Sequence, residues 1–241
     1  MIYNIDKMTS NFRNYYTLLP KKFQSKIDSY KSYPRIKIKT PMRMLIVGTS
    51  GSMKTNALMN IISNINNFTM IFIYAKEINE PLYANLIDIY QHIGRKFDRE
   101  IVTFSNSIKD VPPIEQFDKR EKNLVIFDDL VNETSKNLKN ISDLFCMGRK
   151  RNISTIFISQ SYFKVPMIIR QNVNYVMLKK ISGKRDLNRI LGTMGISENV
   201  SDILEMYRWV QKQNEADVFL IDGITNDLRL RFRINFDPIV S

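Results

Sequence analysis

The sequence is poor in the residues that build disulfide frameworks and metal sites. It contains one cysteine, Cys146, and one histidine, His92. An internal disulfide and a zinc site made of several Cys or His ligands are therefore excluded. A Ser-His-Asp triad would depend on His92 alone, and no nucleophile-elbow pattern lies near it.

Long hydrophobic runs are also missing. No apolar stretch approaches the roughly 18 residues of a membrane-spanning helix, and the first residues lack the apolar core of a signal peptide. We therefore expect an intracellular protein with no transmembrane segment. The length of 241 residues and a hydrophobic content of 44% suffice for one large domain, or a domain with an extension.

Acidic residues are scarce relative to basic ones. The chain has 36 Lys and Arg against 24 Asp and Glu, so its formal net charge is +12 and its pI about 9.7. A balance of this kind favours a polyanionic partner such as nucleic acid. The alternative is a basic protein whose charges are simply solvated.

Much of this charge lies in an N-terminal segment, for which we predict a boundary between residues 41 and 42. Residues 1–40 contribute +7, because two acidic residues accompany nine basic ones, namely Lys7, Arg13, Lys21, Lys22, Lys26, Lys31, Arg35, Lys37 and Lys39. Aromatic residues are interleaved with them, a composition suited to a nucleic-acid backbone. An arm that packs on protein is an equally good interpretation.

A phosphate-binding loop is predicted between residues 48 and 55. The apolar run Met44–Val47 has the length of a strand, and it ends at Gly48 in the segment G-T-S-G-S-M-K-T. An amphipathic helix follows, with apolar residues at i, i+3, i+4 and i+7. In this context backbone N–H groups of Thr49 to Lys54 would surround phosphates, Lys54 would reach the β- and γ-oxygens, and Thr55 would bind Mg²⁺. The loop as predicted comprises Gly48, Thr49, Ser50, Gly51, Ser52, Met53, Lys54 and Thr55.

The loop departs from the usual pattern at one position. Met53 stands directly before the lysine, where the pattern has glycine, and Gly51 lies two residues earlier. An ordinary strand–turn–helix with a chance Lys-Thr pair is therefore the competing interpretation.

Short strands and amphipathic helices alternate from residue 42 onward. This order is typical of an α/β fold with a mainly parallel central sheet flanked by helices. We predict strands at 69–75, 101–104, 124–127, 153–158 and 173–178, with a long loop at 105–122. The chain is expected to close with a hairpin formed by 217–221 and 228–234, which turns at Gly223.

Two of the predicted strands end in polar residues suited to nucleotide hydrolysis. Asp128 and Asp129 follow the apolar strand of N-L-V-I-F-D-D-L, and Gln160 follows Ile153–Ile158. The C-terminal ends of parallel strands share one edge of the sheet, where ligands bind. Asp128 would hold Mg²⁺ opposite Thr55, Asp129 would orient or deprotonate the attacking water, and Gln160 would sense the γ-phosphate.

Two arginines are expected to lie away from this edge. Arg149 stands in a helix-to-strand connection and Arg170 precedes a strand. Such positions are far from the phosphates of the same subunit. They would act on a neighbour's nucleotide or on nucleic acid, and solvated surface charge is the alternative.

Together these motifs resemble the viral genome-packaging ATPases of the FtsK–HerA superfamily, in the poxvirus-type branch that includes small virophage versions. The resemblance covers roughly residues 42–236, and its most specific part is F-C-M-G-R-K-R-N-I-S-T-I-F-I-S-Q-S-Y-F-K-V-P-M-I-I-R-Q-N at 145–172. Lys54, Thr55, Asp128, Asp129 and Gln160 match the phosphate loop, the acidic pair and the sensor of the family. Arg149 and Arg170 match family arginines able to complete a neighbour's site.

The resemblance implies an additional-strand P-loop fold, ATP and Mg²⁺ as cofactors, and a homo-oligomeric ring around double-stranded DNA. It further implies genome packaging into a preformed capsid, in the host cytoplasm, the virus factory or the virion. Met53 and an Asp at 129, where Glu is frequent, are departures that bear on the rate of hydrolysis. A nucleotide- and DNA-binding subunit without turnover, or a nucleotide kinase, are the alternatives. No segment reads as the lid and acceptor pocket that a kinase needs.

Overall fold

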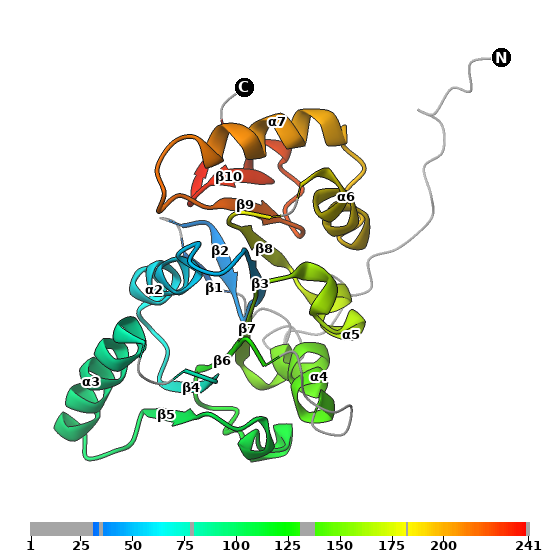
Figure 1. Ribbon diagram of the computed structural model, residues 1–241. Coiled ribbons are helices and arrows are strands. Elements are labelled where there is room, and N and C mark those ends of the chain that lie inside the picture. The colour runs from blue at the N-terminus through cyan, green and yellow to red at the C-terminus, as the bar shows by residue number, and fades with distance from the viewer. Residues whose placement is uncertain (1–30, 34–35, 78–79, 131–137, 182, 240–241) are drawn as a thin grey trace, which may run out of the picture. The chain divides into compact units, whose positions relative to one another are not determined.

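A nine-stranded sheet forms the centre of the computed structural model, which describes residues 31–33, 36–77, 80–130, 138–181 and 183–239. The strand order is β11-β10-β9-β8-β3-β7-β6-β4-β5 (Figure 1). The strands from β8 to β5 in this order run parallel, whereas β9, β10 and β11 pair antiparallel. Their bounds are β3 (Arg43–Val47), β4 (Met70–Ala75), β5 (Val102–Ser105), β6 (Asn123–Asp128), β7 (Ile153–Ser159), β8 (Tyr175–Leu178), β9 (Phe219–Asp222), β10 (Phe232–Ile234) and β11 (Asp237–Pro238).

Helices cover both faces of this sheet (Figure 1). One face packs against α2 (Lys54–Ile65) and α3 (Pro81–Lys96); the other packs against α4 (Leu138–Met147), α5 (Met167–Asn172), α6 (Lys184–Thr193) and α7 (Val200–Gln211). Alternate residues of β3 divide between these two cores, because successive side chains of a strand point to opposite faces. The central strands are buried on both sides, which explains their continuous apolar runs.

The predicted α/β fold is confirmed, and two local predictions need correction. Helix α5 was not predicted, because it has only six residues after Pro166, too few to show a helical spacing of apolar residues. The second arm of the C-terminal hairpin begins at Phe232 rather than at Leu228, because Leu228–Leu230 forms a 3₁₀ turn, η7. The long loop at 105–122 contains two further 3₁₀ turns, η3 (Ile108–Asp110) and η4 (Ile114–Gln116).

A short hairpin precedes the sheet and belongs to the same compact unit. The chain divides after Tyr30, and the unit that the structure describes begins with β1 (Lys31–Tyr33) and β2 (Ile38–Thr40). Ile36 and Ile38 are fully buried in the core on the α2 face. Residues 31–41 are thus part of the domain, and most of the predicted basic extension, residues 1–30, lies outside the described residues.

Arg233 joins this hairpin to the C-terminal strands. Its side chain is fully buried, and its guanidinium donates to Asp222 Oδ2 at 2.7 Å and to the carbonyl oxygen of Ile36 at 2.9 Å. Burial raises the pKa of Asp222, and Arg233 and backbone N–H groups oppose that rise. The hydrogen bond to Ile36 connects segments 197 residues apart in the sequence.

We predict that Arg233→Leu lowers the free energy of unfolding by about 3–5 kcal/mol, because it leaves the Asp222 carboxylate buried without its partner. Urea unfolding followed by circular dichroism measures the effect. Arg229→Leu breaks an exposed ion pair with Asp227 and should change the free energy little. The double variant Asp222→Asn/Arg233→Leu should recover part of the loss; no recovery would contradict the explanation.

Candidate active site

The loop between β3 and α2 is fixed by the two neighbouring strands. Gly48 N–H donates to the Ser159 carbonyl at 3.2 Å at the end of β7, and Thr49 N–H donates to the Lys180 carbonyl at 2.9 Å beyond β8. The N–H of Thr49 was expected to face phosphate, and the structure assigns it to Lys180 instead. Among the described residues, the N–H groups of Ser50, Gly51 and Met53 have no acceptor, so these donors are available to a ligand.

Close packing explains why the loop begins with glycine. A Cβ at Gly48 would lie 2.5 Å from Ser52 Oγ and 2.6 Å from Lys179 Cβ, so a larger residue does not fit. Ser52 Oγ is itself buried, and it has no hydrogen-bond partner within the described part of the chain. An unsatisfied hydroxyl in this position is suited to a phosphate oxygen.

Met53 adopts the backbone conformation that glycine adopts without strain. Its φ of 62° and ψ of 35° place it in the left-handed region, directly before α2. The loop therefore keeps the left-handed turn of a glycine-containing sequence despite the substitution. The side chain is partly exposed, so the cost of the methionine is mainly conformational.

Lys54 lies at the first turn of α2, beside two carboxylates. Its Nζ donates to the Thr49 carbonyl at 3.0 Å, so the side chain curls back over the loop. Burial lowers the pKa of Lys54, and Asp128 and Asp129 partly offset this change. The lysine is thus poised over the loop where phosphates would lie.

Asp128 ends β6 with its carboxylate largely buried. Tyr83 of α3 donates its hydroxyl to Asp128 Oδ2 at 2.8 Å. Burial raises the pKa of Asp128, while the Tyr83 hydrogen bond and the charge of Lys54 oppose that rise. Tyr83 was not among the predicted site residues, because a tyrosine on the apolar side of a helix carries no distinctive signal in the sequence.

Asp129 and Gln160 meet across the same edge. Gln160 Nε2 donates to Asp129 Oδ2 at 2.8 Å, across the ends of β6 and β7. Asp129 has a left-handed φ of 53°, and its N–H donates to the Ile158 carbonyl at 3.1 Å. This turn places the Asp129 carboxylate within hydrogen-bond distance of Gln160.

Glu80 is a further acidic residue that the sequence analysis missed. It precedes α3, in the connection that follows β4, the neighbour of β6. Burial and the charge of Asp128 raise the pKa of Glu80, and a hydrogen bond from Thr55 opposes that rise. Its position after a parallel strand was the only available signal, since four residues separate Glu80 from Ala75, the last residue of β4.

The two predicted arginines occupy different places. Arg149 lies in the 3₁₀ turn η5 (Gly148–Arg151), which enters β7 at the edge opposite Gln160. Arg170 lies in α5, with its guanidinium carbon 5.1 Å from the centre of the Tyr162 ring. Arg149 therefore lies at the far end of β7 from Gln160, whereas Arg170 packs against Tyr162, two residues after Gln160.

The donor set around the loop is composed of hard oxygen atoms, which suit Mg²⁺. Thr55 supplies a hydroxyl and Asp128 a carboxylate, with Glu80 beside them. The described residues contain no group of three or more His, Cys, Asp or Glu side chains arranged for a metal ion. A cation here would consequently need oxygen atoms from a bound phosphate as well.

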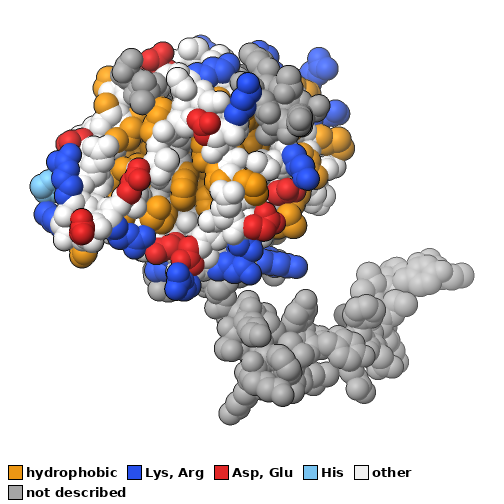
Figure 2. All heavy atoms as spheres, turned by 90° about the horizontal axis from the view of Figure 1, so that it is seen from below, with side chains coloured by type: hydrophobic (Ala, Val, Ile, Leu, Met, Phe, Trp, Pro, Cys, Tyr) orange, Lys and Arg blue, Asp and Glu red, His pale blue; other side chains and the backbone are white. Residues whose placement is uncertain are grey.

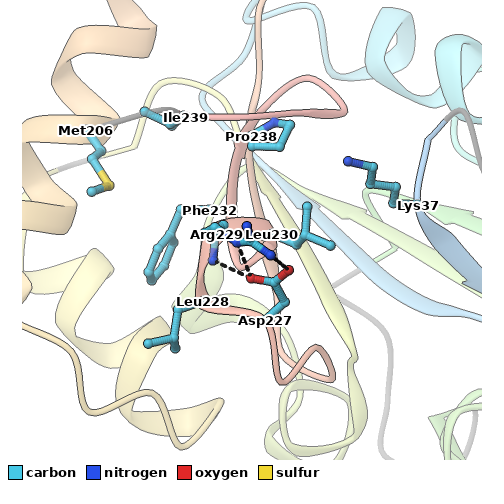
Figure 3. A pocket seen from close by; sticks show the side chains of 9 residues that line it. All are labelled: Lys37, Met206, Asp227, Leu228, Arg229, Leu230, Phe232, Pro238 and Ile239. Atoms are coloured by element: carbon cyan, nitrogen blue, oxygen red, sulfur yellow. Dashed lines mark hydrogen bonds and ion pairs between the residues drawn. The ribbon is translucent and has the colours of Figure 1, made fainter.

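A separate cavity of about 630 Å³ lies among the C-terminal elements (Figure 3). Its walls combine Met206 of α7 with residues of η7, β10 and β11, and the side chain of Lys37 lies at one side. The charged groups on its wall, Asp227 and Arg229, are paired with each other at 2.9 Å. This cavity contains none of the residues around the phosphate loop.

In the sheet, β7 lies between β3, which carries the loop, and β6, which carries the acidic pair. That arrangement, with the loop leading directly into α2, is the P-loop NTPase fold of the additional-strand type. The chain belongs to the family described as poxvirus A32 protein, whose model matches residues 31–232.

Relatives and solved structures agree with this assignment. The DNA packaging protein OPG160 of Monkeypox virus is 28% identical over 229 residues, covering 85% of this chain and 74% of the relative. The Variola virus protein of the same name is 26% identical over 204 residues, covering 80% and 74%. The genome packaging NTPase B204 of Sulfolobus turreted icosahedral virus 2, in complex with AMP, superposes with a TM-score of 0.55 at 12% identity, covering 83% of this chain and 100% of B204.

Among the described helices, none combines the length and the apolar character required to cross a membrane.

We predict that Met53→Gly changes the free energy of unfolding by less than about 1 kcal/mol, because relief of left-handed strain offsets the flexibility of glycine. Met53→Val should lower it by about 1–3 kcal/mol, since a β-branched residue tolerates positive φ poorly. Met53→Ala is the control for loss of the side chain. Urea unfolding distinguishes the three, and equal stability of the valine variant and wild type would contradict the left-handed assignment.

Proposed function

We propose that the protein is an ATP-driven translocase that packages a viral double-stranded DNA genome into a preformed capsid. The observation that carries the proposal is the convergence of the phosphate loop, Asp128 and the Asp129–Gln160 hydrogen bond on one edge of the sheet. Membership of a family with relatives named DNA packaging protein supports DNA as the cargo. The net charge of +12 suits a polyanion.

The loop and Lys54 would bind the phosphates of ATP. The N–H groups of Ser50, Gly51 and Met53 and the Ser52 hydroxyl have no partner within the described structure, and with the Lys54 ammonium they would supply the donors for these phosphates. An anionic ligand would offset the burial that lowers the pKa of Lys54. Thr55 and Asp128 would hold Mg²⁺, which neutralises the charge that develops on the transferring phosphoryl group.

Asp129 and Gln160 would act on the attacking water. The Asp129 carboxylate can accept a proton from water or orient it, and the Gln160 amide holds that carboxylate at 2.8 Å. The same amide can move between Asp129 and a γ-phosphate oxygen, because it has donors and an acceptor. The hydrogen bond therefore offers a way to link the nucleotide state to the segment that follows Gln160.

In a ring of identical subunits, Arg149 or Arg170 would reach the nucleotide bound to the neighbouring subunit. Arg149 lies at the far end of β7 from Gln160 and Arg170 packs against Tyr162, and a neighbouring copy could receive either. The assembly into a ring and the capsid partner are part of the proposal. The competing function, a DNA-binding subunit without turnover, makes the opposite prediction about hydrolysis.

We expect Lys54→Ala and Asp128→Ala to abolish ATP hydrolysis, because each removes charge stabilisation at the phosphoryl group. Asp129→Asn should bind ATP normally and hydrolyse it at least about 100-fold more slowly. Asp88→Asn, an exposed carboxylate of α3, is the matched control. Phosphate release with and without duplex DNA measures these rates. Wild-type turnover by Asp129→Asn would reject its role, and no turnover by the assembled wild type would favour the structural subunit.

Arg149→Ala or Arg170→Ala should bind ATP normally but hydrolyse it slowly, because an arginine supplied by a neighbour typically contributes about 10³–10⁵ in rate. Mixing the responsible variant with Lys54→Ala should restore part of the activity, since a mixed ring can contain one complete site. Arg208→Ala, an exposed arginine of α7, is the control. If mixed rings form and recover no ATP hydrolysis, the proposal that the arginine acts on the neighbouring subunit's nucleotide is contradicted.

A further inference from the structure

An exposed basic face lies beside the nucleotide edge, on α6 and on the 3₁₀ turn η6 (Tyr162–Lys164). In α6 the side chains of Arg185, Asn188 and Arg189, at positions i, i+3 and i+4, are exposed. The side chains of Leu187, Ile190 and Leu191 on the other side of the helix are buried. The turn adds one aromatic and one basic side chain that are also exposed. We define this basic face as Phe163, Lys164, Lys184, Arg185, Asn188 and Arg189.

All charge on this face has one sign. The only carboxylate in segments 160–171 and 183–193 is Asp186, which is buried. The face drawn in Figure 2 is different, because Lys and Arg side chains there are mixed with Asp and Glu. A surface with several cations and no anion repels similar surfaces and attracts a polyanion.

Phe163 holds two of the cations in place. The guanidinium carbon of Arg185 lies 5.4 Å from the centre of its ring, and that of Arg189 lies 6.0 Å from it. Stacking on a ring orders the guanidinium while leaving its edge donors available for phosphate oxygens. The face is therefore ordered for binding before any ligand arrives.

The surface is also concave. One hollow is lined by Phe163, Arg185, Asn188 and Arg189, and an adjoining one shares Asn188 and Arg189 with residues of α5. Figure 1 shows α5 and α6 as neighbours along this flank. A shallow basic groove of this kind matches a nucleic-acid backbone better than a flat protein surface.

Both segments that carry the face are bonded to the nucleotide site. Gln160, three residues before Phe163, donates to Asp129. Lys180, four residues before Lys184, accepts from Thr49 of the phosphate loop. The chain turns tightly around Gln160, because Ser159 Oγ donates to the Ser161 carbonyl at 2.9 Å.

We infer that the basic face binds the phosphate backbone of duplex DNA and transmits the nucleotide state to it through Gln160 and Lys180. The inference rests on the proposed translocase function and specifies where the DNA is held. It requires no base-specific contact, in keeping with a motor that moves DNA of any sequence.

The test compares two double variants that each remove two positive charges from full-length protein. Arg185→Gln/Arg189→Gln removes them from the basic face. Arg95→Gln/Lys96→Gln removes them from the exposed end of α3, on the opposite flank (Figure 1). Binding of a random-sequence duplex oligonucleotide is measured by fluorescence anisotropy across a salt series, and binding of a fluorescent ATP analogue checks that each variant is folded.

We expect the α6 variant to bind DNA at least about tenfold more weakly, with the slope of log K against log salt reduced by about 0.9 for each arginine removed. The α3 variant should keep the wild-type slope. Arg185→Lys/Arg189→Lys retains the charge and should retain most of the slope. Equal slopes for the α6 variant and wild type, or equal losses in both neutralised variants, would overturn the inference.

Two further results separate this inference from the proposed function. A wild type that binds no DNA overturns both. The inference alone is overturned if the wild type binds DNA and the α6 variant binds DNA with the wild-type slope but fails to assemble. That result would assign the basic face to contact with a neighbouring subunit.

Discussion

The phosphate loop is held on both sides by hydrogen bonds from the strands that flank β3. Gly48 N–H donates to the carbonyl of Ser159 at the end of β7, and Thr49 N–H donates to the carbonyl of Lys180 beyond β8. These bonds exist only because β3 lies between β7 and β8 in a parallel arrangement, which brings three strand ends to one edge. The position of every other site residue depends on this constraint.

The site is electrostatically incomplete without a ligand. Burial lowers the pKa of Lys54 and raises the pKa of both Asp128 and Glu80, so each of these groups is less favourably charged here than in water. Hydrogen bonds such as Tyr83 to Asp128 offset part of this cost. A bound nucleotide with its cation would supply opposite charges to all three, so binding energy and the stability of the folded chain are linked.

Acidic and basic residues are separated at the edge of the sheet where the parallel strands end. The end of β6 and the connections beyond β4 and β6 carry the carboxylates Asp128, Glu80 and Asp129, whereas the connections beyond β7 and β8 lead into the basic face. Gln160 stands at the junction of the two groups. Only two residues, Ser161 and Tyr162, separate Gln160 from Phe163 of the basic face.

The sequence by itself determined the α/β class, the loop at 48–55 and the placement of Asp128, Asp129 and Gln160 at strand ends. Local periodicity and the polar residue that ends each strand carry that information, because neighbouring residues fix both. Only the tertiary structure decided that Thr49 N–H is already bonded, that Tyr83 and Glu80 join the site, and that Phe163 orders arginines of α6. These contacts join residues distant in the chain, and their formation depends on strand order and packing, which local patterns do not specify.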